Sequence, residues 1–392
     1  MKEVLLLGAG SLFAALALFA CSDSGGDSGA PPSDDAGVDA IDDARGDVRT
    51  PLEEADAACS ECAWFPESCS KGALCAATVE ALDPRVVLFA LDVHDEEVTA
   101  VGTYGSVVER SAGAWRRVTV GSPDPLRGIA RLGGEAWAAA SVGGVFVRQA
   151  GQGNTAWTGH RPGPDYYGRN MAVTGLFAEP AGTWVWASTA TTCAPSSGSD
   201  GVGLVRLRKQ ADDSGWLDLQ TVIQHQEPMS LCITMNALDG SGGALWVAGE
   251  KGVLYEVTEL EASPPTVTPV SSGTTSSLLG VWAEATGHVF AVGKDGTVQH
   301  RPPGGAFASL GEGVPRVAYH AVRGTSATDV WIAGEDATVM HYDGKRWTRV
   351  PIAGLGDRRP TLRAIAAIAP DRIWVAGDNV LLGLAREDGS AP

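Results

Sequence analysis

Cysteine is the residue type whose spacing most plainly suggests chemistry in this chain. Four of the seven cysteines stand together in the stretch CSECAWFPESCSKGALC, and these are Cys59, Cys62, Cys69 and Cys75. Thiolates this close in sequence either bind zinc or form disulfides. A zinc ribbon presents two CxxC pairs, and only Cys59 and Cys62 have that spacing. The pattern therefore favours two local disulfides, whose pairing stays open, and no metal site.

The N-terminal cysteine, Cys21, follows a stretch of another kind. A basic residue precedes an uncharged apolar run that ends at Ala20; its length is typical of a secretory signal and short for a membrane-spanning helix. The ending LFAC resembles the bacterial lipoprotein signal, which implies that residues 1–20 are removed and that Cys21 is acylated and anchors the chain to a membrane. Ser22 after the cysteine resembles lipoproteins sent to the outer membrane. An ordinary secretory signal beside a cysteine is the alternative.

Residues 21–58 form an acidic segment. They contain 11 Asp and Glu but only two Arg and no aromatic residue, which gives a charge of −9, half of the −18 of the whole chain. Self-repelling charge and low apolar content do not offset the entropy of ordering, so we expect a disordered tether. The segment has no spaced ligand loop for calcium. The acidic balance of the chain also argues against nucleic acid as a partner.

The rest of the chain repeats one strand pattern. An apolar pentad such as VWIAG recurs seven times, and five copies contain Trp at the same place. An apolar strand precedes each pentad by about eight residues, and further strands follow it; such spacing is typical of propeller blades. The last residues of the pentads are Gly102, Ala140, Thr189, Gly249, Gly293, Gly334 and Gly377.

Four short antiparallel strands cannot hide an apolar face alone, and radial stacking of such sheets buries both faces. We therefore predict an all-β fold, a seven-bladed β-propeller over residues 86–392. The recurrent Trp is expected to fill the space between blades, and the recurrent Gly to allow a turn where a Cβ would clash. The repeats resemble those of secreted bacterial β-propeller proteins related to photosystem-II-assembly-factor and sialidase-like propellers. The resemblance implies the fold, but these propellers host many activities.

The seventh repeat ends without a fourth strand, so the propeller needs a closing strand from elsewhere in the chain. The Cys-rich segment, residues 59–85, contains the apolar stretch ALCAATVEAL over residues 73–82. We expect this stretch to pair with VLLGLA, residues 380–385, and to hold both ends of the propeller together.

Blade topology also groups several loops on one face. The loop between the second and third strands lies on the same face as the link to the next blade, so we expect a disulfide between Cys193 and Cys232. The long loop HRPGPDYYGRN lies on that face too, and its aromatic and cationic side chains suit a protein or glycan surface. A loop without a binding role is the alternative. The predicted binding residues are Arg161, Tyr166, Tyr167 and Arg169.

Candidate catalytic residues are few. The seven His residues are scattered, and neither HExxH nor GxSxG occurs. His300 and His341 occupy equivalent places in the third strands of two repeats, which indicates that they belong to the repeat. We predict no catalytic residue and no cofactor.

These features favour a non-enzymatic envelope lipoprotein: an exported monomer, lipid-anchored to the outer membrane, that binds a protein or glycan partner. The alternative is a glycan-directed hydrolase or lyase whose residues converge on the central channel from different blades. Buried carboxylates with raised pKa at the channel mouth would favour the enzyme, and a smooth channel lined by Gly and Ala would favour the binding protein.

Overall fold

The chain divides into two units, Met1–Ala55 and Asp56–Pro392. The described residues all belong to the second unit and begin at residue 63, so the predicted signal peptide and tether (residues 1–58) lie outside them. No helix of this described part is long and apolar enough to cross a membrane. The computed structural model describes residues 63–79, 82–94, 97–111, 113–142, 144–149, 156–162, 171–191, 201–210, 215–225 and 233–386.

The described residues form β-strands, connecting loops and three short 3-10 turns, so the all-β prediction is confirmed. The strands make six sheets: four meanders of four consecutive strands, one sheet of five and one of eight. The eight-stranded sheet consists of two consecutive meanders of four strands each, whose outermost strands pair in parallel.

The strands fall into four sets by their place in each meander. The innermost are β2 (Leu88–His94), β6 (Leu126–Leu132), β10 (Met171–Ala178), β14 (Met235–Ser241), β18 (Leu278–Ala283), β22 (Tyr319–Ser326) and β27 (Leu362–Ala369). The second are β3 (Glu97–Gly102), β7 (Glu135–Ala140), β11 (Val185–Thr191), β15 (Ala244–Gly249), β19 (Val289–Gly293), β23 (Asp329–Gly334) and β28 (Arg372–Gly377).

The third are β4 (Ser106–Ser111), β8 (Val145–Gln149), β12 (Gly201–Lys209), β16 (Leu254–Thr258), β20 (Val298–Arg301), β24 (Val339–Tyr342) and β29 (Val380–Leu384). The outermost are β5 (Ala114–Thr119), β9 (Thr158–Pro162), β13 (Trp216–His225), β17 (Thr266–Pro269), β21 (Ala308–Ser309) and β25 (Trp347–Arg349). Two further short strands, β1 (Leu74–Ala76) and β26 (Ile352–Ala353), join the last sheet.

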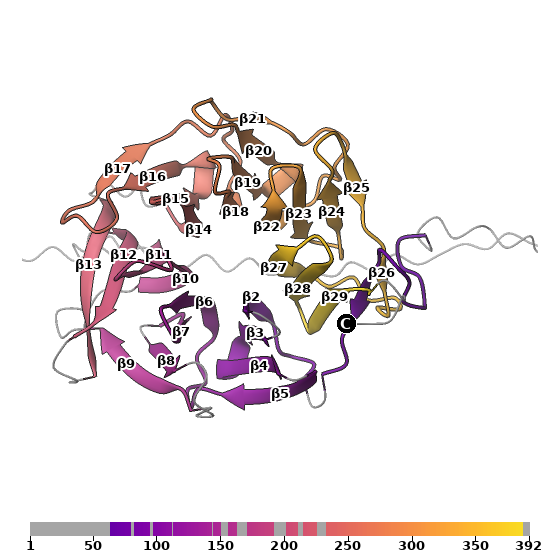
Figure 1. The fold of residues 1–392 in the computed structure, drawn as a ribbon, viewed down its shortest axis with the longest axis horizontal. Helices are drawn as coiled ribbons and strands as arrows, with labels where there is room; N and C mark the ends of the chain where they lie inside the picture. The colour runs from indigo at the N-terminus through magenta and orange to yellow at the C-terminus, as the bar shows by residue number, and fades with distance from the viewer. Residues whose placement is uncertain are drawn as a thin grey trace, which may run out of the picture. The chain divides into compact units, whose positions relative to one another are not determined.

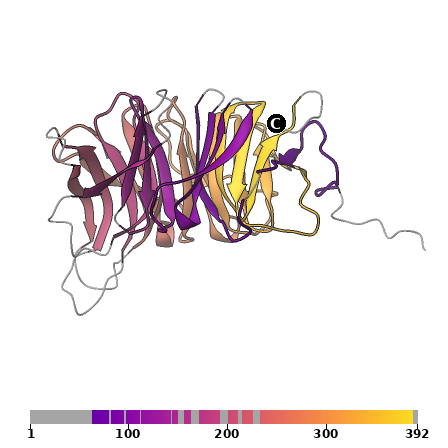
Figure 2. The same ribbon diagram turned by 90° about the horizontal axis from the view of Figure 1, so that it is seen from below.

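The innermost strands lie around one centre (Figure 1). Each contacts the innermost strand of the next meander, from β2 through to β27, and β27 in turn contacts β2. Seen from the side, the strands run between two opposite faces (Figure 2). Because the innermost strands all start at the same face, equivalent residues of the repeats come together there.

The recurrent Trp residues are buried between neighbouring sheets, as the repeat predicted. Trp374 of the last sheet, for example, packs in one cluster with Val98 and Val108 of the first. An indole that buries roughly 200 Å² contributes about 5 kcal/mol of transfer free energy as an upper estimate. The five Trp residues of the second strands expose between 1% and 6% of their surface, and they are Trp137, Trp186, Trp246, Trp331 and Trp374.

The recurrent Gly stands where a Cβ would clash, as expected, but the residues with positive φ in the turn are others. Gly102 has φ −164°, an extended conformation open to any residue, and the turn residues with positive φ are Tyr104 and Gly105. A Cβ at Gly102 would lie 2.1 Å from the carbonyl oxygen of Val87, the residue just before β2. Gly334 meets the carbonyl of Ala318 at the same distance. The Gly therefore lets the start of the innermost strand lie against the end of the second strand.

The N-terminal segment joins the last sheet. Strand β1 pairs antiparallel with β29, with Leu74 opposite Leu384, and in parallel with β26. Leu74 is fully buried. The predicted pairing with residues 380–385 is therefore present, but the strand spans only Leu74–Ala76 and not residues 73–82. The reason is geometric: the chain must cross from this outer position to the innermost strand β2 before Leu88.

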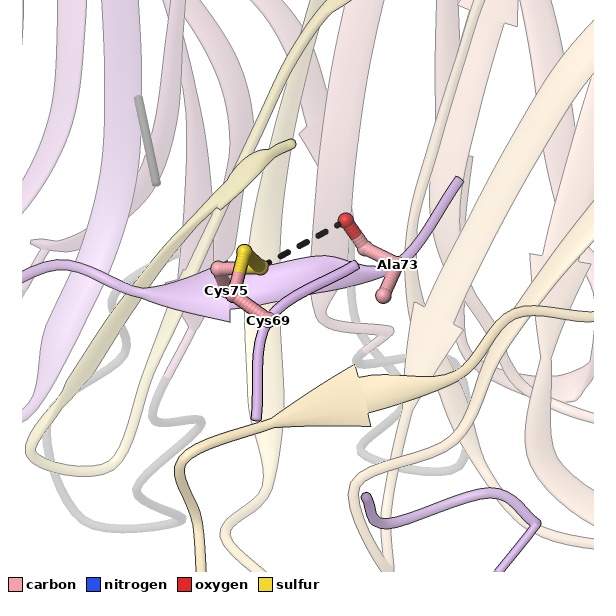
Figure 3. Close-up of a disulfide and its surroundings, with 3 residues drawn as sticks. All are labelled: Cys69, Ala73 and Cys75. Carbon is pink, nitrogen blue, oxygen red and sulfur yellow. Dashed lines mark hydrogen bonds between the residues drawn. A yellow bond between two sulfur atoms is a disulfide. The ribbon is translucent and has the colours of Figure 1, made fainter. Parts of the chain in front are cut away.

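One disulfide joins described residues. Cys69 and Cys75 are bonded with their Cα atoms 5.6 Å apart (Figure 3). The Sγ of Cys75 also lies 3.8 Å from the carbonyl oxygen of Ala73; a disulfide sulfur has no proton to donate, so this is a van der Waals contact. The bond ties the loop over residues 69–75 to β1. Cys59 and Cys62 lie outside the described residues, and their pairing stays a prediction.

Candidate functional site

Each innermost strand contains a β-bulge near its start. In β2 the register with β3 shifts between Leu88 and Ala90, so Phe89 has no partner residue. A bulge re-aims the side chain of its extra residue. The other six innermost strands shift at the equivalent place. The seven bulge residues are Phe89, Arg127, Thr174, Asn236, Leu279, His320 and Arg363.

All seven bulge residues line one cavity of about 340 Å³. The cavity lies where the innermost strands start, and we call it the channel entrance. Its volume falls within the range of small-ligand sites. The repeat thus brings seven side chains of different chemistry to one place, although they lie far apart in the sequence.

The residue after each bulge is small. It is Gly or Ala in all seven strands, and a Cβ at Gly128 would lie 2.6 Å from the backbone nitrogen of Leu176 in the neighbouring strand. Small residues therefore let adjacent innermost strands approach closely. The next residue along is aliphatic and lines a smaller cavity of about 170 Å³. These aliphatic residues are Leu91, Ile129, Leu176, Leu238, Val281, Val322 and Ile365.

The charge at the channel entrance is positive. Its lining includes Arg127, His320 and Arg363, and none of the described residues that line either channel cavity is Asp or Glu. Arg363 forms an ion pair with Asp378, Nε to Oδ1 at 2.6 Å. The guanidinium of Arg127 stacks on the ring of Phe89 at 3.8 Å, and it makes no ion pair with a described residue.

Burial and neighbouring positive charge lower the pKa of both Arg127 and His320. Burial lowers the pKa of Arg127, and the neighbouring Arg363 lowers it further. Burial also lowers the pKa of His320 below its ordinary value of 6.5, Arg363 adds to this, and Glu335 and Asp378 act in the opposite direction. His320 is therefore neutral at pH 7. An anion at the entrance would relieve the repulsion between the cations, so the arrangement suits a carboxylate.

The site residues predicted from the sequence lie partly within and partly outside the described part of the chain. Arg161 lies exposed in the outermost strand β9, opposite Trp216, and lines neither channel cavity. The structure therefore does not bring it to the entrance. The remaining predicted positions lie outside the described residues, and these are Cys21, Tyr166, Tyr167, Arg169, Cys193 and Cys232.

His300 and His341 are packing residues of the repeat, as predicted. They stack on Phe290 and Trp331, which stand opposite them in the neighbouring strands, with ring centroids 4.4 Å and 4.2 Å apart. Within the described ranges, no group of three or more His, Cys, Asp or Glu side chains is placed to hold a metal ion.

Sequence reasoning missed the bulge residues, although a signal for them exists. Each first strand contains an apolar residue, then a variable residue, then Gly or Ala. The seven triplets are LFA, LRG, VTG, MNA, LLG, YHA and LRA. The variable middle residue is the one that the bulge turns into the channel.

No family model and no curated protein matches the chain. Among solved structures, it is similar to YCF48 bound to D1 peptide, with a TM-score of 0.62 and 14% identity over 83% of this chain and 99% of that one. YCF48 from Cyanidioschyzon merolae has a TM-score of 0.59 and 16% identity over 79% and 98% of the two chains. Virginiamycin B lyase from Staphylococcus aureus has a TM-score of 0.60 and 14% identity over 79% of this chain and 97% of that one. Similarities at this identity show the fold alone, and that fold is a β-propeller.

Proposed function

We propose that the chain is a non-enzymatic binding propeller that takes an acidic segment of a partner protein at the channel entrance. The observation that carries this proposal is the convergence of the seven bulge residues. They place two arginines, a histidine and an amide beside the apolar surfaces of Phe89 and Leu279. Arginine presents a planar fork of donors that matches a carboxylate.

The proposal includes a closed architecture. Counting the eight-stranded sheet as two blades gives seven blades, with β1 as the closing strand of the last one. In support, the first and last meanders share one hydrophobic cluster, and Val87 bridges to Asp378. Closure matters for function because it would hold the seven bulge residues at fixed distances before the ligand arrives, and such preorganisation lowers the cost of binding.

The cellular part of the proposal rests on the N-terminal sequence. Residues 1–20 would be the signal peptide, Cys21 the lipid anchor in the outer membrane, and the acidic segment to residue 58 a tether. Residues 59–85 and 86–392 would form the Cys-rich closing segment and the propeller of a monomer. The Cys69–Cys75 disulfide supports export, because disulfides persist in oxidising compartments.

A protein partner is favoured over a glycan. The entrance combines cations with an aromatic and an aliphatic side chain, as peptide-binding surfaces do. One of the similar structures is a propeller bound to a peptide. The loop residues Tyr166, Tyr167 and Arg169 lie outside the described residues, and we propose them as an extension of this surface.

A fluorescent Glu-rich peptide tests the proposal, with the same peptide carrying Gln for every Glu as the uncharged control. The full chain is expected to bind the Glu peptide, and binding should weaken as salt is raised. The double variant Arg127→Gln and Arg363→Gln should lower the affinity about tenfold or more, because each charged hydrogen bond contributes about 1.5–3 kcal/mol. Arg346→Gln, in an exposed turn of another sheet, is the matched control.

Two results would contradict the proposal. Equal affinity of the double variant and the control variant would remove the entrance as the site. Tighter binding of polygalacturonate than of the Glu peptide would replace the protein partner with a glycan.

One observation favours an enzyme as the second candidate, and its form is a glycan-directed lyase. His320 is neutral and lies in the same cavity as Arg363 and Asn236. A neutral imidazole can take the proton from the carbon beside a uronate carboxylate while the arginine stabilises the negative charge that develops. The carbon–oxygen bond to the next sugar then breaks, a double bond forms, and the leaving oxygen takes up a proton. The paired carboxylic acids of a hydrolase are not among the described lining residues.

This candidate predicts an unsaturated product. Polygalacturonate incubated with the full chain would gain ultraviolet absorbance, and His320→Asn would abolish the gain. If the unmodified chain causes no change in absorbance, the lyase candidate is excluded and the binding role remains the proposed function.

A further inference from the structure

A second cavity lies away from the channel, between the first meander, the last sheet and the disulfide loop. Its volume is about 440 Å³, and we call it the seam cavity. It is lined near the end of β2 and the start of β3, so it lies at the opposite end of these strands from the bulge residues. Its lining residues include Val93, Val98, Arg110, Ile373, Trp374 and Leu384.

Part of the wall of the seam cavity is apolar, and this part contains a flat ring. Val98, Ile373 and Trp374 are all buried, with 2%, 1% and 6% of their surfaces exposed. The indole of Trp374 is held by an edge-on contact with Trp115, with ring centroids 5.4 Å apart. A fixed indole beside aliphatic side chains is suited to a flat apolar ligand.

Arg110 supplies the polar partner. Its guanidinium lies 5.7 Å from the ring centroid of Trp374, and its Nε–H is buried without a hydrogen-bond acceptor among the described residues. A buried donor of this kind is stabilised by an acceptor from a ligand. The rim adds the exposed Arg386, and the lining carries only one described carboxylate, that of Asp371.

We propose that the seam cavity binds a small organic anion with a flat apolar body, of the class of aromatic carboxylates. The carboxylate accepts hydrogen bonds from Arg110 and Arg386, and the aromatic body lies against Trp374. Lys71 and Gly72 of the disulfide loop form part of the wall. Such a ligand contacts the first meander, the last sheet and the N-terminal segment at once.

Binding at this place has a structural consequence. A ligand that binds only the folded chain stabilises it in proportion to the logarithm of ligand concentration over Kd. Because the seam cavity spans the first and last meanders, its ligand would hold these two meanders together. Closure of the propeller depends on the contact between them. The ligand would therefore stabilise the closed form of the propeller.

The probe is 2-naphthoate, which combines a flat body with a carboxylate, and 2-naphthamide is its uncharged control. Calorimetry with the full chain is expected to detect naphthoate binding, and saturating naphthoate should raise Tm by about 2–4 °C. Arg110→Gln should weaken binding about tenfold and remove the Tm shift. Arg386→Gln, at an exposed position, should weaken it about threefold.

Arg117→Gln is the matched control, since this exposed arginine lies in the neighbouring strand β5 and does not line the cavity. Equal binding of naphthamide, no detectable binding of naphthoate, or unchanged affinity in Arg110→Gln would each overturn the proposal. If Arg110→Gln does not fold, an unchanged affinity in Arg386→Gln overturns it. Arg127→Gln at the channel entrance should leave naphthoate binding intact, so the two sites are tested independently.

Discussion

Arginine stands at both ends of the innermost strands, but its surroundings differ. At the starts of the strands, Arg127 stacks on Phe89, has Arg363 nearby and makes no ion pair with a described residue. The nearest strong interaction of the Arg127 guanidinium is with the neutral ring of Phe89. The positive charge at this end is therefore only partly compensated by the fold itself.

At the other end, each arginine has an acid from another strand. Arg131 of β6 pairs with Asp92 of β2, and Arg323 of β22 pairs with Asp239 of β14 at 2.5 Å. These pairs connect different meanders, so the fold itself uses their charge. The comparison shows that the surroundings, rather than the residue type, distinguish Arg131 and Arg323, whose acid partners come from other meanders, from Arg127, which has none among the described residues; Arg363 at the entrance pairs with Asp378 of its own sheet.

The largest effect is expected from breaking a pair at the strand ends. Asp239→Ala removes the partner of Arg323 and also the acceptor of the Ala283 N–H, which it bonds at 2.9 Å. Arg323 is partly exposed, so most of the cost comes from the buried N–H, and the free energy of unfolding should fall by about 2 kcal/mol. Urea unfolding measures it, with the exposed Asp357→Ala as control. Equal losses in both variants would show that the Asp239 pair does not hold the structure.

A smaller effect is expected from His320 at the entrance. Because its pKa is lowered in the folded chain, it is neutral at pH 7 and gains charge as the pH falls through the region below about 6.5. The affinity for the Glu peptide should then rise about threefold between about pH 7.5 and about pH 5.5. His320→Gln should abolish the rise, while His94→Gln at the far end of β2 should retain it.

The groups that act on His320 are Arg363, Glu335, Asp378 and Lys294. The same shift makes protonation oppose folding, so the stability contributed by neutral His320 is present above about pH 6.5 and is lost as the pH falls below it. A peptide affinity that does not change with pH in the unmodified chain would contradict the proposed place of His320 in the site.

The smallest effect is expected from Arg127→Gln on stability. The variant loses the stacking on Phe89, which is worth about 0.5–1 kcal/mol, but it also relieves burial of a charge near Arg363. The free energy of unfolding should change by less than about 0.5 kcal/mol while peptide binding falls. A loss as large as that of Asp239→Ala in the same urea experiment would assign Arg127 to the structure.

The sequence predicted the strands well because their signal is local. Apolar pentads mark the second strands directly, and in five of the seven repeats the burial of an indole imposes the same pattern. The bulges depend instead on two strands at once: Phe89 lies between the pairs Leu88–Gly102 and Ala90–Val101 and has no partner of its own. The triplet pattern is visible in the sequence, but its meaning requires that register.

Long-range pairs had no local signal at all. Asp239 and Arg323 come from strands that are not neighbours in the sequence, and only the arrangement of the meanders brings them together. The seam cavity likewise combines residues near both ends of the described chain. Of the predicted loop site, only Arg161 falls within the described ranges, and it lies in the outermost strand β9.

The pairing of β1 with β29 has a consequence for biosynthesis. Leu74 and Leu384 are distant in the sequence, yet the two stand opposite each other in one sheet. Leu74 therefore stays without this cover until the strand that contains Leu384 has been made and has joined the sheet. A truncation before β29 is expected to destabilise the segment around Leu74, far from the truncation in sequence.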